Sequence, residues 1–111
     1  MNEKELFLLK LEDPAKYNVH MASTALINHF DCVKGVYIDE IADKPFSIDK
    51  PYDFRLWRLE LHVDESEYPH IGLENPIRDV IENNVPDVYE MDVSEYLFAS
   101  QSILVIFRTP A

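Results

Sequence analysis

The feature that most constrains the fold is an alternating stretch, YDFRLWRLELHV, at residues 52–63. From Trp57 to Val63 every second residue is apolar, and the residues between them are charged or polar. This period of two predicts a β-strand with one face on a hydrophobic core. Phe54 and Leu56 are apolar on the opposite parity, which indicates either a β-bulge after Leu56 or a strand end covered on both faces. We expect this strand to be central in a small sheet.

The first 35 residues predict helical structure. Residues 3–11, EKELFLLKL, satisfy neither the helical nor the strand period, so both remain open, and a capping box from Asn2 to Glu5 favours a helix. Asp13 followed by proline is a clearer start signal, and an apolar stripe at helical spacing then predicts a long helix over 14–33. Lys34 and Gly35 are expected to form its last turn and its closing residue.

The rest of the chain alternates strand-like and turn-like segments. The expected elements are a strand at 36–41, a short helix at 76–83, an edge strand at 87–93 and a strand at 102–108. Asp92 and Glu95 alternatively cap a one-turn helix that runs to Phe98. Residues 102–108, SILVIFR, form a continuous apolar run, which predicts burial on both faces beside the central strand.

These elements predict an α+β fold in a single domain over residues 1–111. A mainly antiparallel sheet of three to four strands packs against one long N-terminal helix and one or two short helices. The lone cysteine, Cys32, excludes an internal disulfide and fits a reducing compartment. No apolar run approaches the roughly 18 residues of a membrane span, and the N-terminus has no secretion signal. We therefore expect a cytoplasmic protein.

Negative charge is concentrated in the second half of the chain. The formal net charge is −11. Residues 58–111 contain three arginines, no lysine and eleven acids, and all eleven acids lie between Glu60 and Glu95. Such a field repels nucleic acid and anionic membranes and attracts basic partners. The alternative is that the charge only keeps the protein soluble.

Several classes of catalytic site are excluded by composition. The chain has two glycines, Gly35 and Gly72, whereas phosphate-binding loops, dinucleotide fingerprints and nucleophile elbows need glycine at several fixed positions. His29 and Cys32 stand three residues apart without a second pair of zinc ligands. We expect Cys32 to be a packing residue, and we expect no metal, no cofactor and no enzymatic activity.

The acidic segment carries aromatic and apolar residues between its acids, which a solvated surface does not need. Interface cores favour Tyr and Met, and surrounding acids steer a basic partner and raise its association rate. The alternative is that these tyrosines and Met91 pack inward with the acids outside. The predicted partner-binding residues are Asp64, Glu65, Glu67, Tyr68, Asp87, Tyr89, Glu90, Asp92, Glu95 and Tyr96.

These features favour a small binding protein that neutralises a basic protein partner by occluding its active or nucleic-acid-binding surface. An immunity protein or antitoxin against a nuclease toxin is the most concrete form, with Tyr89 and Tyr96 as anchors. One alternative is a phage-type inhibitor that mimics nucleic acid, which needs acids along an extended ridge. Another is a homodimeric chaperone or assembly subunit that pairs through 87–93 or a terminal strand. None of the three binds nucleic acid or a membrane directly.

Overall fold

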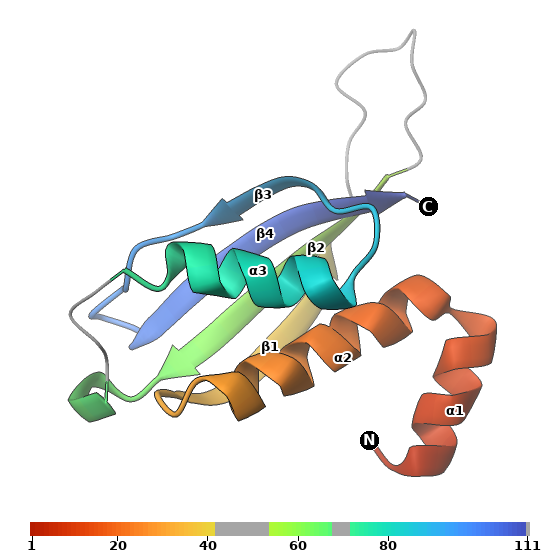
Figure 1. Cartoon of the computed structure of the whole chain (residues 1–111), viewed down its shortest axis with the longest axis horizontal. Helices are drawn as coiled ribbons and strands as arrows, with labels where there is room; N and C mark the ends of the chain where they lie inside the picture. The colour runs from red at the N-terminus through yellow and green to blue at the C-terminus, as the bar shows by residue number, and fades with distance from the viewer. Residues whose placement is uncertain (42–53, 68–71, 111) are drawn as a thin grey trace, which may run out of the picture.

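The computed structural model describes residues 1–41, 54–67 and 72–110. It places a layer of helices against one face of a four-stranded antiparallel sheet (Figure 1). The helical elements are α1 (Glu3–Glu12), α2 (Pro14–His29), the 3-10 turn η1 (Glu65–Glu67) and α3 (Glu74–Asn84). The strands are β1 (Val33–Ile41), β2 (Phe54–Val63), β3 (Tyr89–Val93) and β4 (Ser102–Pro110), in the order β1-β2-β4-β3. The predicted α+β class is therefore confirmed, with two helices rather than one at the N-terminus.

Capping side chains set the starts of the first two helices. The Asn2 side chain accepts a hydrogen bond from the Glu5 amide at 2.8 Å, so residues 3–12 form a helix and not a strand. The Asp13 carboxylate accepts from the Lys16 amide at 3.2 Å, and Pro14 occupies the first turn of α2. Each cap satisfies a backbone N–H that has no partner within the helix.

The predicted end of the long helix is wrong. α2 stops at His29, where the Phe30 amide still bonds to the Leu26 carbonyl at 3.1 Å, and β1 begins at Val33. Gly35 lies inside β1, opposite His62 of β2, instead of closing the helix. Tertiary pairing with β2 overrides the local helix-stop signal, because the β-branched residues of this segment pack well in a sheet.

β2 is central, as predicted, and it carries no bulge. Its register with β4 is continuous from Phe54 to His62, so Arg55 and Trp57 share one face while Phe54 and Leu56 share the other. The apparent change of phase in the sequence arises because a charged residue, Arg55, occupies a position on the helix-facing side. Phe54 and Leu56 remain half-buried on the side without helices.

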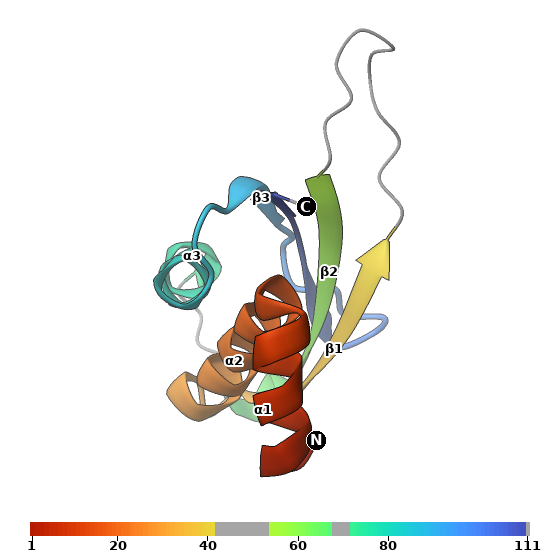
Figure 2. The same ribbon diagram turned by 90° about the vertical axis from the view of Figure 1, so that its right-hand side faces the viewer.

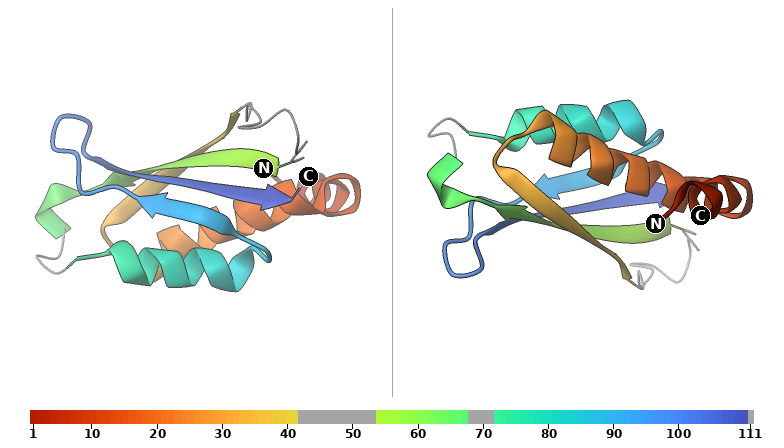
Figure 3. Two further views of the ribbon diagram at one scale, coloured as in Figure 1. Left: turned by 90° about the horizontal axis from the view of Figure 1, so that it is seen from above. Right: turned by 90° about the horizontal axis from the view of Figure 1, so that it is seen from below.

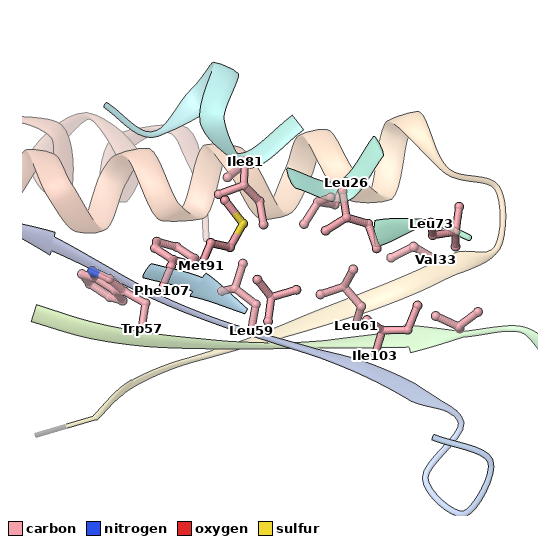
Figure 4. Packing of buried hydrophobic residues seen from close by; sticks show 14 of the residues in the cluster. Leu26, Val33, Trp57, Leu59, Leu61, Leu73, Ile81, Met91, Ile103 and Phe107 are labelled. Atoms are coloured by element: carbon pink, nitrogen blue, oxygen red, sulfur yellow. The ribbon is translucent and has the colours of Figure 1, made fainter. Parts of the chain in front are cut away.

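The core lies between the sheet and the helices α2 and α3 (Figure 4). Trp57, Leu59 and Leu61 of β2 are fully buried there and meet apolar side chains of the neighbouring elements. The indole Nε1–H of Trp57 donates to the Thr109 hydroxyl at 2.8 Å, so the one polar atom of this side chain is satisfied. The other fully buried apolar residues are Val19, Ala22, Leu26, Ile77, Ile81, Val105 and Phe107.

β4 lies beside β2 as predicted, but it is not buried on both faces. Its burial alternates: Ile103, Val105 and Phe107 are buried, whereas Leu104 and Ile106 are half-buried. All three helices lie on the same side of the sheet, as the turned views show (Figures 2 and 3). The apolar run of β4 therefore supplies one face to the core and the other to a surface that none of the described helices covers.

β3 is an edge strand, as predicted from its alternation. Its pairing with β4 shifts register between Tyr89 and Asp92, and Glu90 has a φ of 50°, in the left-handed region. Such a bulge bends the strand and interrupts its ladder. The alternative one-turn helix after Asp92 does not form, because Leu97 instead bridges to Ser102 across the tight connection into β4.

Arg55 joins three elements at the end of the sheet nearest α1. Its guanidinium donates to both carboxylate oxygens of Asp13, at 2.6 and 2.9 Å, and to Glu40 at 2.5 and 3.1 Å. The same group lies 4.6 Å from the ring centroid of Trp57. Hydrogen bonds from Arg55 are the main reason that the pKa values of Asp13 and Glu40 lie below their ordinary values. This network ties the start of α2 to β1 and β2.

Replacing Arg55 with leucine should lower the free energy of unfolding by about 1–2 kcal/mol at pH 7, because the ion pairs are only partly buried. A carboxylate with a depressed folded-state pKa stabilises the fold above its unfolded pKa of about 4, and this contribution disappears as the pH falls through the folded-state value. Urea unfolding at pH 7 and at about pH 3 measures how much the free energy of unfolding falls with acidification. This decrease should be smaller in Arg55→Leu than in wild type. Arg58→Leu, on the other face of β2, is the control and should show the wild-type decrease in the free energy of unfolding. A wild-type decrease in Arg55→Leu would contradict the role of Arg55 in stabilising the ionised Asp13 and Glu40.

Candidate functional site

The face of the sheet opposite the helices, here called the open face, combines apolar and charged side chains. The strand registers determine its membership, because paired residues point to the same side. It contains Tyr37, Asp39 and Ile41 of β1, Phe54, Leu56, Arg58, Glu60 and His62 of β2, Leu104, Ile106 and Arg108 of β4, and Tyr89 and Asp92 of β3.

On the open face the two central strands alternate aliphatic and charged residues, and the outer strands carry aromatic side chains. Leu56, Leu104 and Ile106 are half-buried on the two central strands. Tyr37 is 66% exposed on β1 and Tyr89 is 46% exposed on β3, so a large amphipathic ring stands on each side. Half-buried aliphatic residues between exposed tyrosines resemble the composition of an interface core more than that of a solvated surface.

Ring contacts hold these aromatic groups in place. The Tyr89 ring meets Phe54 edge to face at a centroid distance of 5.5 Å, and the Tyr37 ring meets His62 in the same way at 5.0 Å. Aromatic pairs at such distances are favourable beyond their buried area. Contacts with neighbouring rings therefore restrict the orientation of both tyrosine side chains.

Charged groups lie between the aliphatic residues as well as at the sides of the open face, because Leu56 is paired with Arg108, Ile106 with Arg58 and Leu104 with Glu60. The Arg108 side chain pairs with Glu90, and the His62 Nε2 atom lies 3.5 Å from a Glu60 carboxylate oxygen. Asp39 and Asp92 are both exposed on the outer strands β1 and β3, and their carboxylates border the face on its two sides. Asp39 and Asp92 thus lie at the margin, where they can meet basic groups of a partner without complete desolvation, whereas Glu60 lies on the central strand β2.

The predicted binding residues Asp64, Glu65 and Glu67 lie beyond the C-terminal end of β2, away from the aliphatic residues of the open face. Glu67 pairs with Lys34 at 2.8 Å, and the Asp64 carboxylate accepts from the Ser66 hydroxyl and amide at 2.7 and 3.0 Å. These bonds lower the pKa of Asp64. Tyr68, the fourth residue of this predicted group, is outside the described residues.

The other predicted residues lie on or next to β3. Asp87, Tyr89, Glu90, Asp92 and Glu95 are all exposed, and Tyr89 and Asp92 belong to the open face. Strand spacings put Asp92 roughly 20 Å from Asp64. The structure therefore divides the predicted set into two groups instead of bringing it into one patch.

Tyr96 is not a surface anchor, because only 9% of it is exposed and it belongs to the core cluster. Its ring packs edge to face against Phe98, which is 74% exposed. The inward-packing alternative therefore holds for Tyr96 and for the buried Met91, whereas Tyr89 remains at the surface. The segment divides its aromatic residues between core and surface.

Sequence reasoning missed Tyr37 and the aliphatic residues Leu56, Leu104 and Ile106. A signal for the aliphatic residues was present: Leu56 is out of phase in β2, and the β4 run is apolar at every position. From the sequence alone, the first pattern indicates a bulge or a strand end covered on both faces, and the second indicates burial on both faces. In the absence of a second covering layer among the described residues, the same patterns indicate an apolar surface.

Other candidate sites are weaker. A hollow of about 430 Å³ lies between the start of α3 and the segment after β3, where Glu74, Glu95 and Phe98 are among its lining residues. Cys32 is buried, which raises the pKa of its thiol, and it lies in the turn before β1 instead of on a helix with His29. Across residues 1–41, 54–67 and 72–110, no three side chains of His, Cys, Asp or Glu converge as metal ligands.

A second exposed apolar surface lies on α1. Phe7 and Leu11 are 62% and 66% exposed, Leu8 is 43% exposed, and no residue of this helix is buried. α1 contacts α2 and lies at one end of the molecule (Figure 1). No helix in the described part of the chain has the length and apolarity to cross a membrane. No protein family, curated protein or solved structure matches this chain.

Proposed function

We propose that this chain is a small, non-enzymatic binding protein that neutralises a basic protein partner through its open face. The observation that supports this most is the set of half-buried aliphatic residues Leu56, Leu104 and Ile106, which lie between the exposed Tyr37 and Tyr89, with Asp39 and Asp92 exposed on the outer strands. Aliphatic and aromatic contacts supply affinity, and acids at the margin supply steering and selectivity for a basic surface. The net charge of −11 extends that steering over the whole molecule.

The most concrete form is an immunity protein or antitoxin against a nuclease toxin, acting in the cytoplasm. Nucleases carry basic surfaces that bind phosphates, and a compact acidic protein can cover such a surface directly. Asp87, Asp92 and Asp39 are the acids placed to meet Lys or Arg, and Tyr89 is the anchor that retains its predicted surface position. Inhibition would be steric and electrostatic, so it needs no chemistry from this chain.

Affinity capture from the native source, followed by a nuclease assay on the retained protein, tests this proposal. The expected result is a basic protein whose nuclease activity falls to the baseline when one equivalent of this chain is added. The matched control is Ile106→Arg, which places a positive charge at the centre of the open face and should abolish capture. Retention of the same protein by wild type and Ile106→Arg, or retained proteins that are all acidic, would contradict the proposal.

The alternative function that the many acidic residues also fit is that of a protein that mimics nucleic acid. A mimic presents charges along an extended ridge and makes few apolar contacts, so its affinity falls steeply with salt. A partner bound through the open face should lose much less affinity between about 0.05 and 0.2 M salt than the 10³-fold or more typical of several phosphate-like contacts. Titration of the captured partner at these two salt concentrations separates the two functions.

A further inference from the structure

We propose that two copies of this chain associate through their β1 strands, which pair antiparallel and join the two sheets into one of eight strands. This interface lies along one side of the partner surface proposed above and shares Tyr37 and Asp39 with it, but it is tested on the purified protein alone. The inference rests on a difference between the two edges of the sheet. β1 and β3 are both edge strands of the described sheet, but features that oppose pairing interrupt the middle of β3, whereas in β1 the one register shift lies at its start.

The β3 edge is short and interrupted. It has five residues, a register shift between Tyr89 and Asp92, and a left-handed residue at Glu90. Its acids would also face acids of a second copy. Short length, bulges and like charges are the devices by which natural sheets block edge-to-edge pairing. Pairing of two copies through 87–93, one form of the homodimer considered from the sequence, is therefore disfavoured.

The β1 edge has few such devices. Its only irregularity is at Lys34, and from Gly35 to Ile41 its register with β2 is unbroken. β1 packs against β2 and α2, and its outer edge faces the viewer in the right-hand view of Figure 3. Tyr37 is 66% exposed and Ile41 is 37% exposed, so apolar area as well as unpaired backbone groups remains open along this edge. An uninterrupted edge of this length is a template for another strand.

Charge selects one register for two antiparallel β1 strands. When Tyr37 lies opposite Tyr37 of the second copy, Val36 faces Ile38, Gly35 faces Asp39, and Lys34 comes next to Glu40. Lys34 and Glu40 remain 52% and 42% exposed despite their pairs within the chain. Centring the pair on Asp39 would place two carboxylates opposite each other, which is destabilising.

The placement of the acids makes this association compatible with a strongly negative chain. β3, with Asp87, Glu90 and Asp92, is at the opposite edge of the sheet, three strand spacings or roughly 14 Å from β1. Two copies joined through β1 therefore keep their β3 acids at the two far ends. The open faces become continuous across the junction and remain available to a partner.

Cysteine cross-linking tests the register. In Tyr37→Cys the two new thiols would lie in directly opposed positions, within the range of a disulfide. Ile41→Cys is the matched control, because residue 41 faces residue 33 and the two thiols would be roughly 25 Å apart. Under mild oxidation at about 100 μM, we expect a reducible covalent dimer from Tyr37→Cys and at least tenfold less from Ile41→Cys. Wild type, with its buried Cys32, should form none.

Sedimentation equilibrium tests the charge pairing. Lys34→Glu would place two acids together and should weaken dimerisation about tenfold. Glu67→Gln removes the same ion pair within the chain without changing the charge at the junction, so it should dimerise like wild type. A wild-type protein that is monomeric at about 100 μM would overturn the proposal, as would equal cross-linking of the two cysteine variants.

Discussion

Trp57→Ala is expected to lower the free energy of unfolding by about 4 kcal/mol, a large part of the 5–15 kcal/mol typical of a domain. Trp57 is fully buried on the central strand, where Phe107 is its paired neighbour on β4. Truncation leaves a cavity in the core and removes the donor to the Thr109 hydroxyl, which is itself buried. Urea unfolding followed by circular dichroism measures the effect.

Two variants control this measurement. Trp57→Phe keeps most of the volume and loses the hydrogen bond, so it should cost less, about 1–3 kcal/mol. Phe7→Ala removes an exposed aromatic residue from α1 and should stay within about 0.5 kcal/mol of wild type. A loss below about 1 kcal/mol for Trp57→Ala would contradict the central position assigned to this side chain.

Reversing Asp87 and Asp92 to lysine together is expected to weaken binding of the basic partner about 100-fold, mainly by slowing association. Asp92 lies on the open face and Asp87 just before β3, and both are exposed, so the fold should survive the change. Like charges placed across an interface cost several kcal/mol, and the reversed residues would face Lys or Arg of the partner. Binding kinetics at constant ionic strength give the result.

Asp79→Lys with Glu82→Lys is the matched control. Both residues are exposed on α3, which lies on the helical side of the sheet, and the change in net charge is the same. If the general field of the protein held the partner, the two double variants would bind equally weakly. A loss confined to the Asp87 and Asp92 variant is what a localised interface requires.

Much of the fold follows from local patterns. Three features can be recognised from neighbouring residues alone: the alternation of β2, the Asp13–Pro14 helix start and the edge character of 87–93. The end of α2 cannot be recognised in this way, because Gly35 looks like a helix-closing residue in isolation and becomes a strand residue through its pairing with β2. A short window of sequence does not show which distant strand a segment will pair with.

The site was less accessible to prediction than the fold. Acids crowded between Glu60 and Glu95 appear contiguous along the chain, yet β2 and β3 are separated by β4, which divides them into two groups. Burial also differs between residues that have the same type and a similar sequence context, since Tyr89 is exposed whereas Tyr96 is in the core. Apolar residues out of phase, such as Leu56, reveal an uncovered face only after the number of layers is known.

Hydroxyl-radical footprinting of the complex with the captured partner tests the central claim most directly, because it compares side-chain exposure on the two sides of the sheet. Tyr89 and Leu104 on the open face should be protected when the partner is bound. Phe7 and Leu11 on α1, which are more exposed in the free protein, should be modified at unchanged rates. Protection of α1 with continued modification of Tyr89 and Leu104 would contradict the assignment of the open face as the binding surface.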